Sequence, residues 1–155
     1  MRKSKTMIKV GAIAALAAVG AAAVPALAHH SYAMFDQTRT VTLTGIAYRY
    51  AAIPTHAELH FYMLGPDGKL VKKDGKNADF GVEMAGAAGM ARQGITAATF
   101  PPGTILSVKV NPMRNGSNFG SLASGIAKCP WRTPPAPGMA CDSVAGHELL
   151  GAKTF

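Results

Sequence analysis

The sequence is poor in several residue types, and each shortage narrows the range of functions. Its 155 residues include two cysteines, one tryptophan and eight acidic side chains, against 16 basic ones. A chain of this length is too short for two ordinary domains with large cores. The nucleophile elbow G-x-S-x-G, the phosphate-binding loop G-x-x-x-x-G-K-[ST] and the dinucleotide fingerprint are all missing. The sequence therefore offers no recognised catalytic motif, and we expect a binding protein rather than an enzyme.

The first 28 residues have the organisation of a cleaved signal peptide. An uncharged apolar run, residues 10–24, is followed by Pro25 and by the small-residue pattern Ala26-x-Ala28 that signal peptidase reads. Four basic side chains precede the run: Arg2, Lys3, Lys5 and Lys9. An uncleaved membrane anchor over residues 10–28 is the alternative. We predict a signal peptide over residues 1–28, export to the periplasm or the exterior, and no stable membrane anchor after cleavage.

Cleavage after Ala28 would leave one domain, residues 29–155, and would change the charge balance. The four basic residues of the signal would be lost with no acidic ones, so 12 basic side chains would face eight acidic ones, a net charge of +4. Scattered lysines at this level are typical of solubility, and no strand interleaves basic with aromatic residues. We therefore expect no nucleic-acid partner.

The two cysteines bracket a proline-rich stretch, "CPWRTPPAPGMAC", residues 129–141. An exported chain meets an oxidising compartment, so we predict a disulfide between Cys129 and Cys141, which would hold Trp131 against the end of the domain. The spacing excludes a redox Cys-x-x-Cys motif. A pair of metal thiolates is the less favoured alternative.

The rest of the chain is dominated by strand patterns. β-Branched and aromatic residues in alternation, bounded by turn residues, predict strands over residues 40–50, 56–64, 79–85, 104–112 and 118–127, with an edge strand within 147–155. A short helix is expected over residues 86–95, and turns over 65–69, 101–103 and 114–117. The order of strands and helix predicts a mainly β fold, a small five- to six-stranded OB-like barrel with one short helix. A β-sandwich is the alternative.

Several motifs resemble a bacterial family of small exported proteins that is catalogued as a domain of unknown function. They are "HHSYAMFD", "VTLTG", "IPTHAEL", "GVEMAGAAGMARQGI", "PPG" and "VKVNPMRNGS", within residues 28–126. The matching positions are His29, His30, Ser31, His56, Glu83, Arg92, Gly94, Pro102 and Gly103. The asparagine and tryptophans of the family pattern are absent, Thr55 intervenes before His56, and the loop 129–141 lies outside the pattern. The resemblance implies an OB-like fold and no particular activity.

The histidines after the predicted cleavage site carry the most specific chemistry. Cleavage would make His29 the first residue, so its α-amine and its ring Nδ1 could chelate one metal ion, as half of a histidine brace for copper. His30 allows a different mode through the amine, an amide nitrogen and the second ring. Ser31 occupies the third position, where the common amino-terminal copper motif needs histidine. A solvated terminus without metal is the competing interpretation.

A second candidate set is His56, Glu58 and His60, which share one face of a predicted strand. The alternating residues Ala57, Leu59, Phe61 and Met63 should face the core. His56 and His60 would then lie about 13 Å apart along the strand, too far for one ion, although Glu58 with either histidine could bind one. His56 is the favoured third metal ligand beside His29 and His30, with Glu58 and His60 as accessory residues. An exposed polar face without a ligand is the competing interpretation.

Two further sets of residues are weaker candidates for a functional site. Glu58 and Glu83 could in principle form a carboxylate pair for glycoside chemistry, but nothing nearby in the sequence supports that role. Met34 and Met63 could bind Cu(I), but methionine more often fills cores.

The sequence thus leads to an exported binding module that takes an unknown small ligand, a metal or a protein, with copper as its most specific candidate. A mononuclear-copper enzyme or electron-transfer protein, and a structural protein-interaction domain without metal, are the alternatives.

Overall fold

The computed structural model describes residues 32–151, and the chain divides into two units at Met34 and Phe35. The first unit includes a 3-10 turn, η2 (Tyr32–Met34). The second unit is mainly β. Its elements are β1 (Val41–Ala51), β2 (Glu58–Leu64), β3 (Lys72–Lys73), β4 (Lys76–Asn77), β5 (Asp79–Glu83), α2 (Ala87–Arg92), η3 (Ala97–Thr99), β6 (Ile105–Pro112), β7 (Phe119–Lys128), η4 (Cys141–Ser143) and β8 (Glu148–Leu150).

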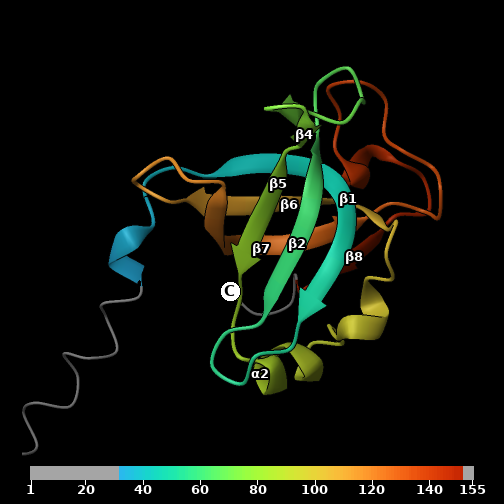
Figure 1. Cartoon of the computed structure of the whole chain (residues 1–155). Coiled ribbons are helices and arrows are strands. Elements are labelled where there is room, and N and C mark those ends of the chain that lie inside the picture. Colours follow the sequence, from blue (N-terminus) through green and yellow to red (C-terminus); the bar gives the residue numbers. More distant parts are fainter. Residues whose placement is uncertain (1–31, 152–155) are drawn as a thin grey trace, which may run out of the picture. The chain divides into compact units, whose positions relative to one another are not determined.

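Six of these strands form one sheet in the order β5-β2-β1-β6-β7-β8, whose neighbours all pair antiparallel. β5 also pairs with β7 in parallel, from Gly81 opposite Phe119 to Glu83 opposite Ser121. Strands β3 and β4 form a separate two-stranded hairpin. In Figure 1, α2 lies at one end of the sheet and β4 at the opposite end.

The predicted strands are confirmed, with small differences at their ends. The predicted helix is shorter than expected and spans six residues, because Gly94 takes a left-handed conformation (φ 76°) that stops it. A 3-10 turn, η3, follows. The predicted edge strand is confirmed over β8, and residues 152–155 lie outside the described range. The β3–β4 hairpin was not predicted, because strands of two residues leave no readable alternation.

The main core lies on one face of the sheet, and a smaller cluster of Ala127, Cys129 and Cys141 lies under the disulfide loop. Fifteen buried apolar residues form the main core, including the inward-facing residues Ala57, Leu59 and Phe61 of the second strand segment, which are fully buried. Met63 packs against the same cluster while partly exposed. The predicted alternation of this segment is therefore confirmed. Its polar residues must lie on the outer face, where they can meet a ligand.

Candidate functional site

The outer face of β2 and β5 carries a group of titratable side chains that we call the His–Glu cluster: His56, Glu58, His60 and Glu83. The two strands pair antiparallel, with Glu58 directly opposite Glu83 and His60 opposite Gly81. The sequence predicted that His56, Glu58 and His60 share a face. The two residues considered as a carboxylate pair, Glu58 and Glu83, do lie opposite each other. The sequence did not predict that Glu83, on a strand that begins 21 residues after β2 begins, would contact His56.

His56, in the loop before β2, lies beside Glu83, which is the last residue of β5 and precedes α2. His56 Nδ1 lies 3.5 Å from Glu83 Oε1, and the two side chains are 42% and 18% exposed. Backbone hydrogen bonds fix this junction, since the Ala57 amide donates to Ala85 and the Met84 amide donates to Ala57. Both residues belong to the motifs that carry the family resemblance, and the fold brings them together across 27 positions of sequence.

Glu58 and His60 form the second pair of the His–Glu cluster. His60 Nε2 lies 2.9 Å from Glu58 Oε2, and the side chains are 16% and 27% exposed for His60 and Glu58. Gly81 lies opposite His60, and the absence of a side chain there leaves room for the Phe119 ring and for the imidazole of His60. Each carboxylate of the cluster therefore contacts one imidazole, and no imidazole contacts both carboxylates.

Two tyrosines extend the polar face along β1 and β2, and sequence reasoning missed them as site residues. Tyr48 and Tyr62 stack with ring centroids 4.5 Å apart, and the Tyr48 ring lies 6.1 Å from the His60 ring. A bulge between Ala47 and Arg49 in β1 places Tyr48 here. Strict alternation in a strand would put Tyr48 and Tyr50 on one face, whereas this bulge separates them.

The hydroxyl of Tyr48 is linked to the first residue of β5. It donates a hydrogen bond of 3.4 Å to Asp79 Oδ2. Partial burial raises the pKa of Tyr48, and the negative charge of Asp79 raises it further. Tyr50, which packs against Phe100 on the core side, also has a raised pKa because of burial. Both phenols are therefore neutral hydrogen-bonding groups near pH 7.

The predicted metal ligands are only partly within the described range. His29 and His30 lie outside residues 32–151, so the copper prediction for them stays a prediction. Within that range, no group of three histidine, cysteine or carboxylate side chains is arranged to hold a metal ion. His56 and His60 lie beside different glutamates. The described part of the chain therefore supplies candidate single ligands rather than a complete metal site.

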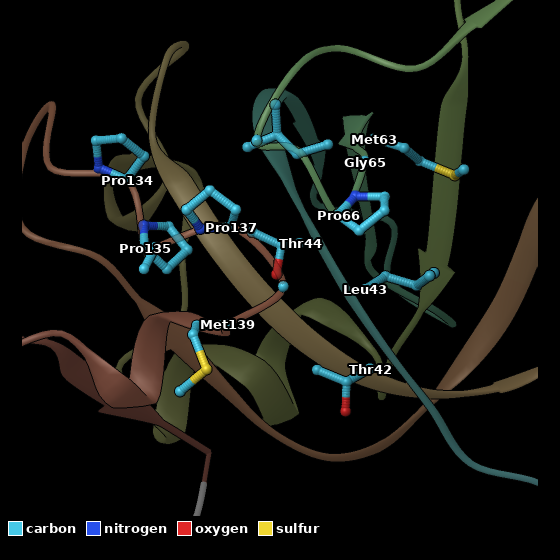
Figure 2. Close-up of a pocket in the computed structure, with 14 residues that line it drawn as sticks. Thr42, Leu43, Thr44, Met63, Gly65, Pro66, Pro134, Pro135, Pro137 and Met139 are labelled. Atoms are coloured by element: carbon cyan, nitrogen blue, oxygen red, sulfur yellow. The ribbon is translucent and has the colours of Figure 1, made fainter.

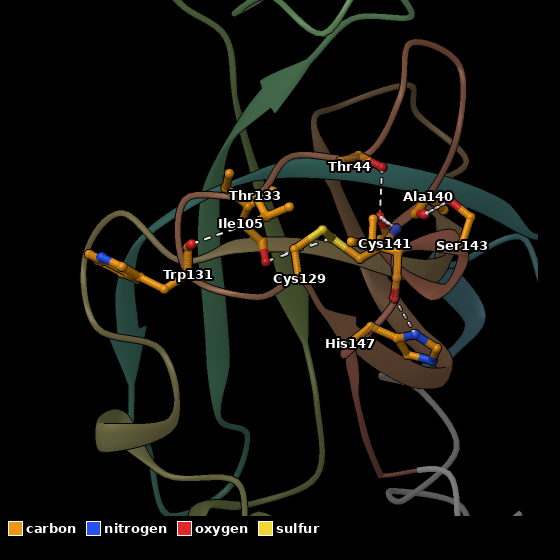
Figure 3. The surroundings of a disulfide bond; sticks show 11 residues. Thr44, Ile105, Cys129, Trp131, Thr133, Ala140, Cys141, Ser143 and His147 are labelled. Carbon is orange, nitrogen blue, oxygen red and sulfur yellow. Dashed lines mark hydrogen bonds between the residues drawn. A yellow bond between two sulfur atoms is a disulfide. The ribbon is translucent and has the colours of Figure 1, made fainter.

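The predicted disulfide between Cys129 and Cys141 is confirmed, with the sulfur atoms 2.01 Å apart. Both cysteines are buried, and the Cys141 amide donates a 2.8 Å hydrogen bond to Ser107 Oγ. The Ser107 hydroxyl shares a second hydrogen bond with Thr44 (Figure 3). The expectation for Trp131 was wrong: its ring is 60% exposed and points away from the disulfide, with only its tip near Gly103.

The proline-rich loop forms one wall of a shallow cleft of about 260 Å³ (Figure 2). Pro134, Pro135 and Pro137 line that wall, and Met63 and Pro66 lie on the opposite wall. Ligand pockets are usually about 300–1,000 Å³. The cleft is smaller than this range and its lining carries no charged side chain. The polar face of β2 and β5 is chemically richer and is the better candidate site.

These features define a small, mainly β domain with a disulfide-closed loop and a polar outer face. The family model that matches the chain covers residues 16–123, and the chain belongs to this family, the family of unknown function DUF6152. The resemblance inferred from the motifs is thereby confirmed as membership of a domain family of unknown function. No curated protein and no solved structure matches the chain. No helix within residues 32–151 is long and apolar enough to cross a bilayer.

Proposed function

We propose that this chain is an exported, non-catalytic binding module built on an OB-like barrel, and that the outer face of β2 and β5 binds its ligand. The observation that carries the proposal is the His–Glu cluster beside the stacked Tyr48 and Tyr62. Carboxylates and imidazoles offer hydrogen-bond donors and acceptors, and the rings offer apolar surface. This chemistry suits a polar ligand without negative charge, because the carboxylates repel anions.

The barrel is supported by the strand pairing. The antiparallel order β5-β2-β1-β6-β7, together with the parallel pair β5–β7, links five strands in a ring. The short helix α2 lies in the chain between β5 and β6, in keeping with a Greek-key barrel of this type. A small barrel is filled by its own side chains. A ligand must therefore bind outside, where the polar residues lie.

Export is supported by the sequence of residues 1–28 and by the disulfide. Structural disulfides persist in oxidising compartments outside the cytoplasm. Mass spectrometry of the exported protein should show a chain that begins at His29. An intact amino terminus would contradict both the processing and the copper chemistry that depends on it.

The binding face can be tested by nuclear magnetic resonance on the exported protein. We expect a neutral oligosaccharide, cellotetraose, to shift the backbone signals of Tyr48, His60 and Glu83, and a short single-stranded oligonucleotide to leave them unchanged. Glu58→Gln should weaken the oligosaccharide response about tenfold, since it removes a charged hydrogen-bond acceptor. Glu148→Gln, the same change outside the face, should not. Shifts confined to the proline-rich cleft, or no shifts with either probe, would contradict the proposal.

Copper binding at the amino terminus is a second candidate function, and the contact and exposure of His56 are consistent with a ligand role for it. Metal-ligating histidines usually direct their other ring nitrogen to a carboxylate or carbonyl. His56 directs Nδ1 toward Glu83 and is 42% exposed, so Nε2 could serve as a ligand. His29 would supply the amine and its ring, with His30 or His56 as the next nitrogen.

The α-amine distinguishes this copper site from an ordinary histidine cluster. A protein that starts at Ala28 keeps every side chain but separates the amine from the His29 ring. Its Cu(II) affinity in calorimetric titration should fall steeply relative to a protein that starts at His29, and lower pH should release the metal. His56→Ala should weaken binding only if that ring is a ligand. Equal affinities of the two amino termini would end the copper hypothesis.

A further inference from the structure

The lysines of the described chain are concentrated in one hairpin. We call residues 69–77 the basic hairpin; they include β3, β4 and the turn between them. Four of the six lysines within residues 32–151 lie in it, and all four are exposed: Lys69, Lys72, Lys73 and Lys76. In Figure 1 β4 lies at the end of the sheet opposite α2. Two backbone hydrogen bonds join this segment to β2: the Val71 amide donates to the Met63 carbonyl, and the Met63 amide donates to the Ala78 carbonyl.

The lysine ammonium groups of the basic hairpin lack acidic partners. Among the described residues, ion pairs link His56 to Glu83, His60 to Glu58 and Lys128 to Glu148, and none involves the hairpin. Lys72 Nζ instead donates to the side-chain carbonyl of Asn77. The charge of the hairpin is therefore available to an external partner, whereas Lys128 is neutralised within the fold.

The geometry of the hairpin places like charges together. Lys73 lies directly opposite Lys76 in the pairing, an arrangement that destabilises an isolated sheet. The turn between them, Asp74 and Gly75, has φ values of 52° and 75°, the left-handed pair typical of a tight hairpin turn. This turn fixes the two lysines side by side at the tip. An anionic surface would relieve their repulsion.

Nearby acidic residues only partly offset this charge. Asp67 accepts a hydrogen bond from the Lys69 amide and shapes the preceding turn, and Asp74 lies in the hairpin turn itself. Asp79 begins β5 two residues after the hairpin and is exposed. Four lysines against these three aspartates leave an excess of one positive charge. The segment from residue 65 to residue 78 has no aromatic side chain. It therefore lacks the stacking surface that a single-stranded nucleic acid needs.

We propose that the basic hairpin docks the domain on a bilayer surface that contains anionic phospholipid. Lysines near such a surface gain attraction that decays within a Debye length. One excess charge raises the partition onto the membrane about fivefold at low salt. This binding is weak and reversible. It leaves the His–Glu cluster free for a separate ligand, so the inference does not depend on the proposed function.

Vesicle cosedimentation of the exported, processed protein tests the proposal. We expect binding to vesicles of phosphatidylglycerol in phosphatidylcholine, a loss of binding at high salt, and no binding to pure phosphatidylcholine. The variant K72Q/K73Q/K76Q should bind the anionic vesicles at least about tenfold less tightly. The matched variant R39Q/K109Q/R132Q loses the same charge from exposed positions elsewhere and should keep most of the binding.

Three outcomes would overturn the proposal. Equal weakening in the two triple variants would show that net charge alone attracts the protein. Equal binding to both kinds of vesicle would remove the role of anionic lipid. Binding of soluble polyphosphate by the hairpin, without binding to vesicles, would assign the charge to a free polyanion. Asp74→Asn removes one acidic group from the turn and should strengthen vesicle binding, which separates the proposal from a misfolded hairpin.

Discussion

The polar face of β2 and β5 and the proline-rich loop are organised by different physical means. On the face, the strand register positions each side chain, so Glu58 lies opposite Glu83 because their backbones pair. In the loop, a covalent bond and one buried hydrogen bond to Ser107 hold residues that belong to no regular ladder. The side-chain contacts on the face therefore follow from the strand register of the sheet. The loop depends on its cross-link.

Removal of the disulfide should give the largest effect and should separate the two regions. We expect C129S/C141S to lower the free energy of unfolding by about 3 kcal/mol, since the cross-link no longer restricts the unfolded chain. Chemical denaturation would measure this change. The signals of Tyr48 and His60 should stay in place, because the strands that carry them do not need the loop. Loss of those signals would show that the face also depends on the cross-link.

Ser107→Ala should have a smaller effect on the same region. It leaves the buried Cys141 amide without its acceptor, and we expect a loss of about 1 to 2 kcal/mol in the free energy of unfolding. Ser124→Ala is the matched control, because Ser124 is half-buried and its hydroxyl forms no hydrogen bond within residues 32–151. Its effect should stay within about 0.5 kcal/mol. Similar losses in the two variants would contradict the role assigned to Ser107.

The smallest expected effect concerns the tyrosine hydroxyl on the polar face. Asp79→Asn should lower the pKa of Tyr48 toward its ordinary value, because the charge of Asp79 contributes to the present rise while burial remains. The pKa of Tyr50, raised by burial alone, should not change. Ultraviolet titration with Tyr50→Phe as a reference would separate the two phenols. An unchanged pKa of Tyr48 in the Asp79→Asn variant would contradict the contact between Tyr48 and Asp79.

The raised tyrosine pKa values also predict the sign of a pH dependence. The folded protein holds these phenol protons more tightly than the unfolded chain does. Stability should therefore decline as pH rises above the ordinary tyrosine value of about 10, and the decline should end above the raised pKa values.

The sequence was informative where the signal was local. Alternation in "HAELHFYML" predicted that Leu59 and Phe61 face the core and that Glu58 and His60 face outward, and both were confirmed. The stacking of Tyr48 on Tyr62 could not be predicted, because it depends on a bulge that shifts the register of one strand. The exposure of Trp131 was also missed, since a loop without periodicity gives no indication of its inner side.

The sequence by itself determined the strands of the six-stranded sheet, the buried face of β2 and the disulfide, because side-chain alternation is a property of a single strand and the chain has only two cysteines. Tertiary structure alone decided which strands lie together. The parallel pairing of β5 with β7, the register that sets Glu58 against Glu83, and the approach of His56 to Glu83 all join distant segments. Such pairings are chosen by the packing of the whole core, and no local pattern encodes them.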